Sequence, residues 1–411
     1  MLLTSRQGTH LAKDDFCLSC HHPRNVLEDH IHPPRALKLP AYLMSFHDLG
    51  IPRSTATVCV TAFNVVDARA VSVLANTLMK PVGASYELFR FPIFTFLITH
   101  TASGRRVLFD LGARKDLENT TPAIAEDVRS GLIVMPIARD FVEQLGDYGV
   151  QAESISAAIW SHAHFDHIGD VSRFPASTDL VFGDATPRKT RPSHPQAMLM
   201  ESDLTGRKLV PIAFDDSSLQ IGGFKAHDYF GDGSLYLLDV PGHLSGHICA
   251  LTRVTPTSFC FLGGDAAHHV GMIRPTAALH HSFPAPPALL ASTKHSVALT
   301  AIAPSASIDT DTDQPFDLAA RTTPLLDVAE GGYYEDAPTA RASIALIGAF
   351  DANPDVLVVL AHDESLLDIV GPEFPASLDR WQERGWKERA VWAFLEEGNV
   401  AFRFGDTKEE V

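Results

Sequence analysis

The sequence has no run of about 18 or more apolar residues, which a membrane-spanning helix would require. Its N-terminus, MLLTSRQGTHLAKDD, lacks the apolar core of a secretory signal peptide. Cysteine is scarce, with five among 411 residues, and such an odd, sparse set argues against a disulfide scaffold. From these absences we expect a protein of a reducing compartment and predict a cytoplasmic location.

Basic residues are also few, since 33 Lys and Arg stand against 50 Asp and Glu and give a formal net charge of -17. An acidic surface repels phosphate backbones and anionic lipid, so we expect neither a nucleic-acid nor a membrane partner. The sequence contains no GxSxG nucleophile motif and no repeat of fixed period. A serine-hydrolase elbow and a repeat array are therefore not predicted, while both a monomer and a homodimer remain open.

The chain is predicted to divide into an N-terminal extension, residues 1–52, and one catalytic domain, residues 53–411. The extension mixes Pro, His and charge without periodicity, so we expect it to be poorly structured or to wrap around the domain. Helical patterns occur at 138–149, Thr339–Phe350 and Ala376–Glu397. Apolar, β-branched runs predict strands at 57–66, 89–100, 103–112, 154–162, 180–184, 208–214, 224–230, 235–240, 248–254, 258–265 and 356–363.

Residues 276–332 differ from their surroundings because Pro, Ala, Ser and Thr dominate them. We predict a lid-like insertion here, with short helices such as 286–293. Outside it, strands gather in two groups with helices between them. This pattern predicts an α/β protein in which two mixed β-sheets pack face to face and helices cover both outer faces.

Four potential metal ligands lie within six residues of the segment SHAHFDHIGD: His162, His164, Asp166 and His167. The two alternating histidines follow an apolar strand and point the same way, because side chains in a strand repeat every two residues. The other two lie on a turn into a predicted helix. Imidazole and carboxylate ligands suit zinc, iron or manganese. No cysteine joins the group, which argues against a closed structural zinc site.

Three further candidates each follow an apolar strand: His243 in PGHLSGH, Asp265 at the end of LGGD, and His362 in LAHD. Each lies where a strand gives way to a loop, the place where a rigid scaffold presents chemical groups. The order and context of the candidates favour a common site.

The series HAHFDH, PGHLSGH, GGDAAHH and VLAHD resembles the metallo-β-lactamase superfamily. It is especially similar to the branch that contains quorum-quenching acyl-homoserine lactonases, to which glyoxalase II is related. The resemblance covers roughly residues 57–395. It implies an αββα sandwich with two divalent metal ions at one edge, zinc being expected and iron or manganese being compatible. The insertion would overhang the site and set substrate choice.

By motif position, the resemblance implies two ligand sets joined by one carboxylate. They are His162, His164 and His243 for the first ion, Asp166, His167 and His362 for the second, and Asp265 as the bridge. His247 would support these ligands from behind.

Two ions of this kind bridge and acidify a water, which removes the need for a serine or cysteine nucleophile. We therefore predict a dinuclear hydrolase whose bridging hydroxide opens a lactone, or a related ester or lactam, of a small-molecule carbonyl substrate. Asp166 is expected to orient the hydroxide and to carry a proton to the leaving group. Lactonases of this branch have a tyrosine three residues after the bridging aspartate, and here that position is His268. We predict that His268 supplies a comparable donor, and that His269 or Arg274 shapes the pocket.

Two other functions stay open within the same fold. Hydrolysis of a thioester, as in glyoxalase II, is the nearest alternative. An iron-dependent dioxygenase is less favoured, because such members drop part of the second metal site and this chain retains all of it. A nuclease is disfavoured by the acidic charge.

Several other residues allow two interpretations of their role. Cys17 and Cys20 form a CxxCH pattern typical of haem attachment or a zinc knuckle, but an incidental match in the extension is the favoured interpretation. Asp110 either supports the metal site or forms a turn, and Asp363 either orients a ligand or caps a turn. The tryptophans near the end are expected to pack rather than to stack on a ligand: Trp381, Trp386 and Trp392.

Overall fold

The computed structural model describes residues 45–66, 71, 73–82, 88–214, 218–293, 308–309, 314–315, 317–370 and 374–396. By its internal contacts the chain separates into residues 1–40 and 41–411, and every described residue belongs to the second unit. The expected extension up to residue 44, with Cys17 and Cys20, lies outside the described residues. Phe46, Leu49 and Ile51 are buried, so the packed domain begins before the boundary expected at residue 53.

One sheet is mixed and has seven strands in the order β11-β8-β7-β6-β5-β1-β21. The bounds are β1 Val58–Asn64, β5 Phe94–His100, β6 Arg106–Phe109, β7 Ile155–Ile159, β8 Asp179–Gly183, β11 Leu209–Ile212 and β21 Ala376–Ser377. Strands β5 and β6 form the predicted hairpin, whose turn contains Gly104 at φ 70°. From β6 to β11 the neighbours are parallel, which aligns the carboxyl ends of β6, β7 and β8.

The second sheet has six strands in the order β12-β13-β14-β15-β16-β20. The bounds are β12 Gln220–Ile221, β13 Phe224–Asp228, β14 Leu235–Asp239, β15 Ile248–Thr255, β16 Ser258–Leu262 and β20 Val356–Val359. Its first five strands are antiparallel in sequence order, whereas β20 lies parallel to β16. The ends of β16 and β20 therefore reach the same edge of the sheet.

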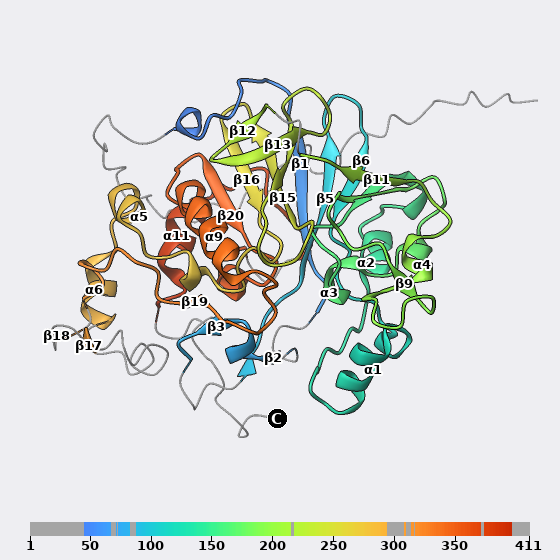
Figure 1. Ribbon diagram of the computed structural model, residues 1–411. Coiled ribbons are helices and arrows are strands. Elements are labelled where there is room, and N and C mark those ends of the chain that lie inside the picture. The colour runs from blue at the N-terminus through green and yellow to red at the C-terminus, as the bar shows by residue number, and fades with distance from the viewer. Residues whose placement is uncertain are drawn as a thin grey trace, which may run out of the picture. The chain divides into compact units, whose positions relative to one another are not determined.

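The two sheets pack face to face through alternating apolar side chains. Val58 and Val60 of β1 belong to the same buried cluster as Leu235 and Leu237 of β14. Helices lie outside, with α9 and α11 on one side of the sheets and α1 to α4 on the other (Figure 1). This arrangement is the predicted αββα sandwich, and the fold class is confirmed.

The helices mostly follow the apolar periodicity of the sequence. Their bounds are α1 Pro122–Arg129, α2 Phe141–Asp147, α3 Phe165–Ile168, α4 Glu201–Leu204, α5 Ala277–Ser282, α6 Pro287–Thr293, α9 Ala337–Asp351, α10 Leu367–Val370 and α11 Trp386–Ala393. Helix α2 starts with a capping box of Asp140 and Glu143, which satisfies two otherwise unpaired backbone N–H groups.

The helix expected over Ala376–Glu397 is wrong in its first part. Residues Ala376–Ser377 form strand β21 beside β1, and the carboxylate of Asp379 accepts a hydrogen bond from the N–H of Val60 at 2.6 Å. Pairing with a sheet edge satisfies the backbone of this segment, so the helix begins only at Trp386, after Gly385 in the left-handed region. The three C-terminal tryptophans are buried and pack as expected.

Short ladders complete the domain: β2 Val73–Leu74 with β4 Leu88–Phe89, β3 Met79–Lys80 with β19 Asp327–Val328, β9 Thr190–Arg191 with β10 Leu199–Met200, and β17 Ile308–Asp309 with β18 Gln314–Pro315. Within the expected insertion, α5 lies beside α9 (Figure 1), and Trp392 of α11 donates a hydrogen bond to the carbonyl of Phe283. Because 294–307 lies outside the described residues, a lid over the site stays a prediction.

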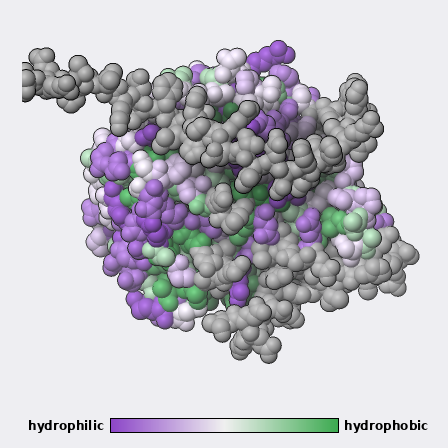
Figure 2. Space-filling view, turned by 180° about the vertical axis from the view of Figure 1, so that it is seen from behind, coloured by the Kyte–Doolittle hydropathy of each residue, from purple (hydrophilic) through white to green (hydrophobic). Residues whose placement is uncertain are grey.

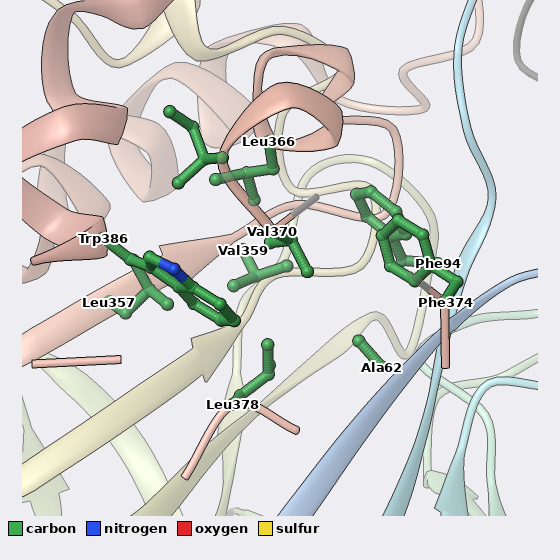
Figure 3. Close-up of a pocket in the computed structure, with 10 residues that line it drawn as sticks. Ala62, Phe94, Leu357, Val359, Leu366, Val370, Phe374, Leu378 and Trp386 are labelled. Carbon is green, nitrogen blue, oxygen red and sulfur yellow. The ribbon is translucent and has the colours of Figure 1, made fainter. Parts of the chain in front are cut away.

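A small gap remains in the core between the sheets, lined by Phe94, Val359 and Trp386 among others (Figure 3). Its volume of about 10 Å³ admits at most one water, so it is a packing gap and not a substrate pocket. On the face seen in Figure 2, hydrophilic residues cover most of the described surface. In the ranges that the structure describes, no helix has both the length and the apolar character needed to cross a membrane.

Candidate metal centre

Three ring nitrogens converge where β7 and β14 end. Nε2 of His162 lies 2.8 Å from Nδ1 of His164, and Nε2 of His243 lies 3.1 and 3.0 Å from those two atoms. A tetrahedral zinc site with bonds of about 2.0–2.1 Å would place its nitrogens roughly 3.3 Å apart, close to this spacing. Burial, reinforced by the neighbouring histidines, holds the pKa of His162 and His243 well below its usual value. These rings are therefore neutral, which is the form that binds metal.

A second group gathers beside the first, with Asp166 and His167 on α3 and His362 after β20. The nearest carboxylate oxygen of Asp166 lies 3.8 Å from Nε2 of His167 and 3.6 Å from Nε2 of His362. Burial alone would lower the pKa of both histidines, but the surrounding carboxylates, Asp265 foremost, raise it instead. Three ligand atoms thus face one point from two different elements.

Asp265 stands between the two groups and offers one oxygen to each. Its Oδ2 lies 3.6 Å from Nε2 of His162 and 3.5 Å from Nε2 of His243. Its Oδ1 lies 3.1 Å from Nε2 of His167 and 3.0 Å from Nε2 of His362. Burial would raise the pKa of this carboxyl group, but the facing histidines hold it well below its usual range. The group is therefore an anion between two sets of imidazoles.

Unpaired polar atoms show that the residues fit metal ions. Nε2 of His167 and Oδ1 of Asp265 are both buried and lie 3.1 Å apart, but the orientation of the two groups gives neither atom a well-formed hydrogen bond. A buried polar atom without a partner costs about 1–3 kcal/mol, which a cation bonded to both atoms would remove. The seven residues predicted as ligands fall into two groups able to hold metal ions, His162, His164, His243 and Asp265 in one and Asp166, His167 and His362 in the other.

Hydrogen bonds from behind orient the candidate ligands. The carboxylate of Asp110 accepts from Nδ1 of His167 and from the hydroxyl of Ser161, both at 2.8 Å. Nδ1 of His362 donates to the carbonyl of Pro92 at 2.9 Å. In both histidines the hydrogen bond occupies Nδ1 and turns Nε2 toward the metal position. Metal-ligating histidines are usually fixed in this way.

His247 lies behind the ligands, as expected. Its Nδ1 donates to the carbonyl of Val240 at 3.0 Å, and its Nε2 accepts from the N–H of Asp265 at 3.1 Å. Burial, offset in part by Asp265, lowers the pKa of His247 to about 4, so the ring is neutral. It therefore positions the loop that carries the bridging carboxylate.

Of the three residues after Asp265 that were predicted to shape the pocket, one lies at the site and two make other contacts. His268 lies at the site, with Nε2 3.3 Å from Oδ2 of Asp265. His269 accepts a hydrogen bond from the N–H of Gly271 and caps a short turn. Arg274 pairs with Asp351 of α9 through bonds of 2.8 and 2.9 Å, so its guanidinium is committed to a buried ion pair instead of the pocket.

Sequence reasoning missed two tyrosines at the site. The hydroxyl of Tyr334 lies 2.8 Å from Nδ1 of His268, and the ring of Tyr333 meets that of His164 edge to face. Both belong to the run EGGYYED, which matches no motif and lies outside all of the histidine motifs. Of the two interpretations of Asp363, the structure favours the turn cap, because its carboxylate accepts hydrogen bonds from the N–H and the hydroxyl of Ser365.

Comparison with known proteins places these observations in a family context. Residues 89–260 match the family described as the metallo-beta-lactamase superfamily. The metallo-hydrolase mfmC of Annulohypoxylon moriforme is 36% identical over 377 residues, which cover 88% of this chain and 93% of that protein. The gamma-lactamase FDB1 of Fusarium pseudograminearum is 35% identical over 355 residues, covering 84% and 83%.

Among solved structures, the chain is similar in fold to an AiiA variant from B. thuringiensis with N-decanoyl-L-homoserine bound at its active site. The TM-score is 0.50 at 14% sequence identity, and the alignment covers 78% of this chain and 99% of that one. At so low an identity the likeness concerns the fold alone.

Proposed function

The chain belongs to the metallo-β-lactamase superfamily, and on that premise we propose that it is a dinuclear metal-dependent hydrolase that opens a lactone or lactam ring. The observation that carries the proposal is the position of Asp265. Its two oxygens face two separate groups of histidines at 3.0–3.6 Å. A single ion would leave one oxygen and one buried histidine group without a partner, whereas two ions satisfy both.

Two divalent cations, with zinc expected, would supply an acidified water and a polarised substrate carbonyl at neutral pH. The chain provides neutral imidazoles for the first position and a carboxylate-rich set for the second. The side chain of Asp166 is 11% exposed, against 4% for Asp265, so it is the more accessible of the two carboxylates. This accessibility supports the proposal that Asp166 passes a proton to the leaving group.

A lactone is the first substrate class, and a lactam is the second because the relative FDB1 carries the name gamma-lactamase. In both reactions a water oxygen adds to the ring carbonyl, and the ring C–O or C–N bond breaks. The departing nitrogen of a lactam needs a proton more than the departing oxygen of a lactone does. The acidic and histidine groups beside the site therefore matter most for the lactam. The complete second group of ligands disfavours a mononuclear iron dioxygenase.

Metal analysis together with a substrate screen tests this proposal. The purified chain should bind about two ions and convert γ-lactones or γ-lactams to the ring-opened hydroxy or amino acid, with thioesters and β-lactams as comparison substrates. His162→Ala and His362→Ala should each lower the metal content and abolish turnover, while Asp265→Ala should weaken both positions. His281→Ala, which alters an exposed histidine of α5, is the matched control. One iron per chain without formation of a ring-opened product would overturn the proposal.

A further inference from the structure

The segment Gly331–Asp336 is fastened to the loop that carries His243. The N–H of Glu335 donates to the carbonyl of His243 at 2.9 Å. One carboxylate oxygen of Glu335 accepts from the N–H of Ser245 at 2.6 Å and from its hydroxyl at 2.8 Å. At the other end, the N–H of Tyr333 donates to the carbonyl of Thr77 at 3.0 Å. The segment between these bonds is thus held against the metal centre.

This anchoring brings Tyr334 to His268. The tyrosine is buried, its hydroxyl lies 2.8 Å from Nδ1 of His268, and the two rings meet edge to face with centroids 5.1 Å apart. The other nitrogen of the same imidazole, Nε2, lies 3.3 Å from Oδ2 of Asp265. His268 therefore connects a buried phenol to the bridging carboxylate.

Two proton arrangements fit these positions. In the first, the phenol donates to Nδ1 of His268, and Nε2 carries the ring proton toward Asp265. In the second, Nδ1 donates to the phenol oxygen, the phenol turns to the sulfur of Met272 at 3.9 Å, and a lone pair of Nε2 faces the carboxylate. A thioether is a weak acceptor compared with an imidazole nitrogen, and a lone pair facing a carboxylate is repelled. Both effects favour the first arrangement.

We propose that Tyr334 is a positioning residue that holds His268 as the Nε2–H tautomer, which makes His268 a hydrogen-bond donor to the substrate and not a metal ligand. At 3.3 Å the contact with Asp265 is longer than a good charge-assisted hydrogen bond of about 2.7–2.9 Å. The Nε2–H group is therefore available to a substrate carbonyl or a leaving atom at the first metal position. This catalytic consequence rests on the proposed function, whereas the tautomer itself does not.

Nitrogen NMR of the histidine-labelled chain reads the tautomer directly. The signals of His268 are identified by their loss in His268→Gln, and spectra are recorded with and without zinc. We expect the proton on Nε2 and an accepting Nδ1 in the native chain. In Tyr334→Phe the two tautomers should mix. A proton on Nδ1 in the native chain, or an unchanged spectrum in Tyr334→Phe, would overturn the inference.

Kinetics test the catalytic consequence with the substrate found in the screen. Tyr334→Phe should lower kcat by about two- to tenfold, because only the molecules that keep the Nε2–H tautomer of His268 retain the donor, and it should leave KM within about twofold and the metal content unchanged. The double variant with His268→Gln should lose no more than His268→Gln alone. Tyr236→Phe, which removes another buried hydroxyl away from the site, should keep the native kcat.

The outcomes distinguish a failure of the tautomer assignment from a failure of the proposed function. An equal loss in Tyr236→Phe, or additive losses in the double variant, would reduce Tyr334 to a general structural role. If the native chain hydrolyses no cyclic carbonyl while the spectra show the Nε2–H tautomer, the proposed function fails and the tautomer assignment stands.

Discussion

Asp110 accepts a hydrogen bond from Nδ1 of His167 at 2.8 Å while its own backbone lies in the left-handed region at φ 58°. That backbone conformation costs most residues other than glycine roughly 1–2 kcal/mol, and Asp and Asn tolerate it better than the rest. The carboxylate of Asp110 also accepts hydrogen bonds from the N–H and the hydroxyl of Ser161, the residue before His162. These bonds offset the strain of the backbone. Of the two interpretations of the sequence, the contacts favour support of the candidate ligands, and the backbone at Asp110 forms no turn.

Asp110→Asn should weaken binding of the second ion by about 10–100-fold, the usual loss when a partner behind a metal-ligating histidine is removed. Asparagine tolerates the left-handed backbone, so the effect isolates the carboxylate. Competition with a chromophoric chelator measures the affinity. Asp110→Gly relieves the strain but lacks any side chain, and it should bind the second ion no better than the Asn variant. Native affinity in Asp110→Asn would contradict this role.

The motif-bearing part of the site was accessible from sequence because local geometry determines it. His162 and His164 alternate after an apolar strand, and His243, Asp265 and His362 each follow another strand, so the sheet edges bring them together. Whether they bind two ions is part of the proposal; strand ends and motif order favoured a common site, and the resemblance to the metallo-β-lactamase superfamily implied the two ligand sets.

The tyrosines could not be found in the same way. Tyr334 reaches His268 only because Glu335 bonds Ser245 and the segment packs against Thr77, contacts between residues far apart in the chain. Arg274 was misplaced for the same reason, since its partner Asp351 is 77 residues away. Local sequence patterns contain no information on such pairings. The strand at Ala376–Ser377 likewise depends on β1, a strand far from it in the sequence.

Gly332→Ala should displace the segment that carries Tyr334. A Cβ atom at this position would overlap the carbonyl oxygen of Thr77, which belongs to the backbone and cannot move aside cheaply. We expect kcat to fall at least as far as in Tyr334→Phe, with a lower Tm. Gly331→Ala is the control, because its Cβ would meet nothing within 4 Å, although its φ of 73° adds modest strain. Equal kcat in the two variants would contradict the packing argument.

Asp351→Asn should destabilise the fold strongly. Asp351 is fully buried and pairs with both Arg274 and Lys387, the latter at 3.1 Å. Removing the anion leaves two buried cations without compensation, which typically costs about 3–5 kcal/mol. Urea unfolding of the variant and the native chain measures the difference. A loss below about 1 kcal/mol would show that water reaches the pair when the anion is gone.

Lys387→Met, by contrast, should cost little at pH 7. Burial lowers the pKa of Lys387 to about 8, an effect that Asp351 opposes in part. Asp351 keeps both bonds to Arg274 in this variant, and methionine avoids the desolvation of a charge, so a change within about 1 kcal/mol is expected.

The same lysine should give the native chain a characteristic dependence on alkaline pH. Since the folded pKa of about 8 lies below the ordinary lysine value of 10.5, the unfolded chain binds more protons between these values. The free energy of unfolding contributed by Lys387 therefore rises with pH through this window, by roughly 1–3 kcal/mol. The difference in urea stability between native chain and Lys387→Met, followed from pH 7 to 10, isolates this contribution from other titrating groups. Lys208→Met, which alters an exposed lysine, should leave the slope unchanged, and a native slope in Lys387→Met would mean that the lysine is charged throughout.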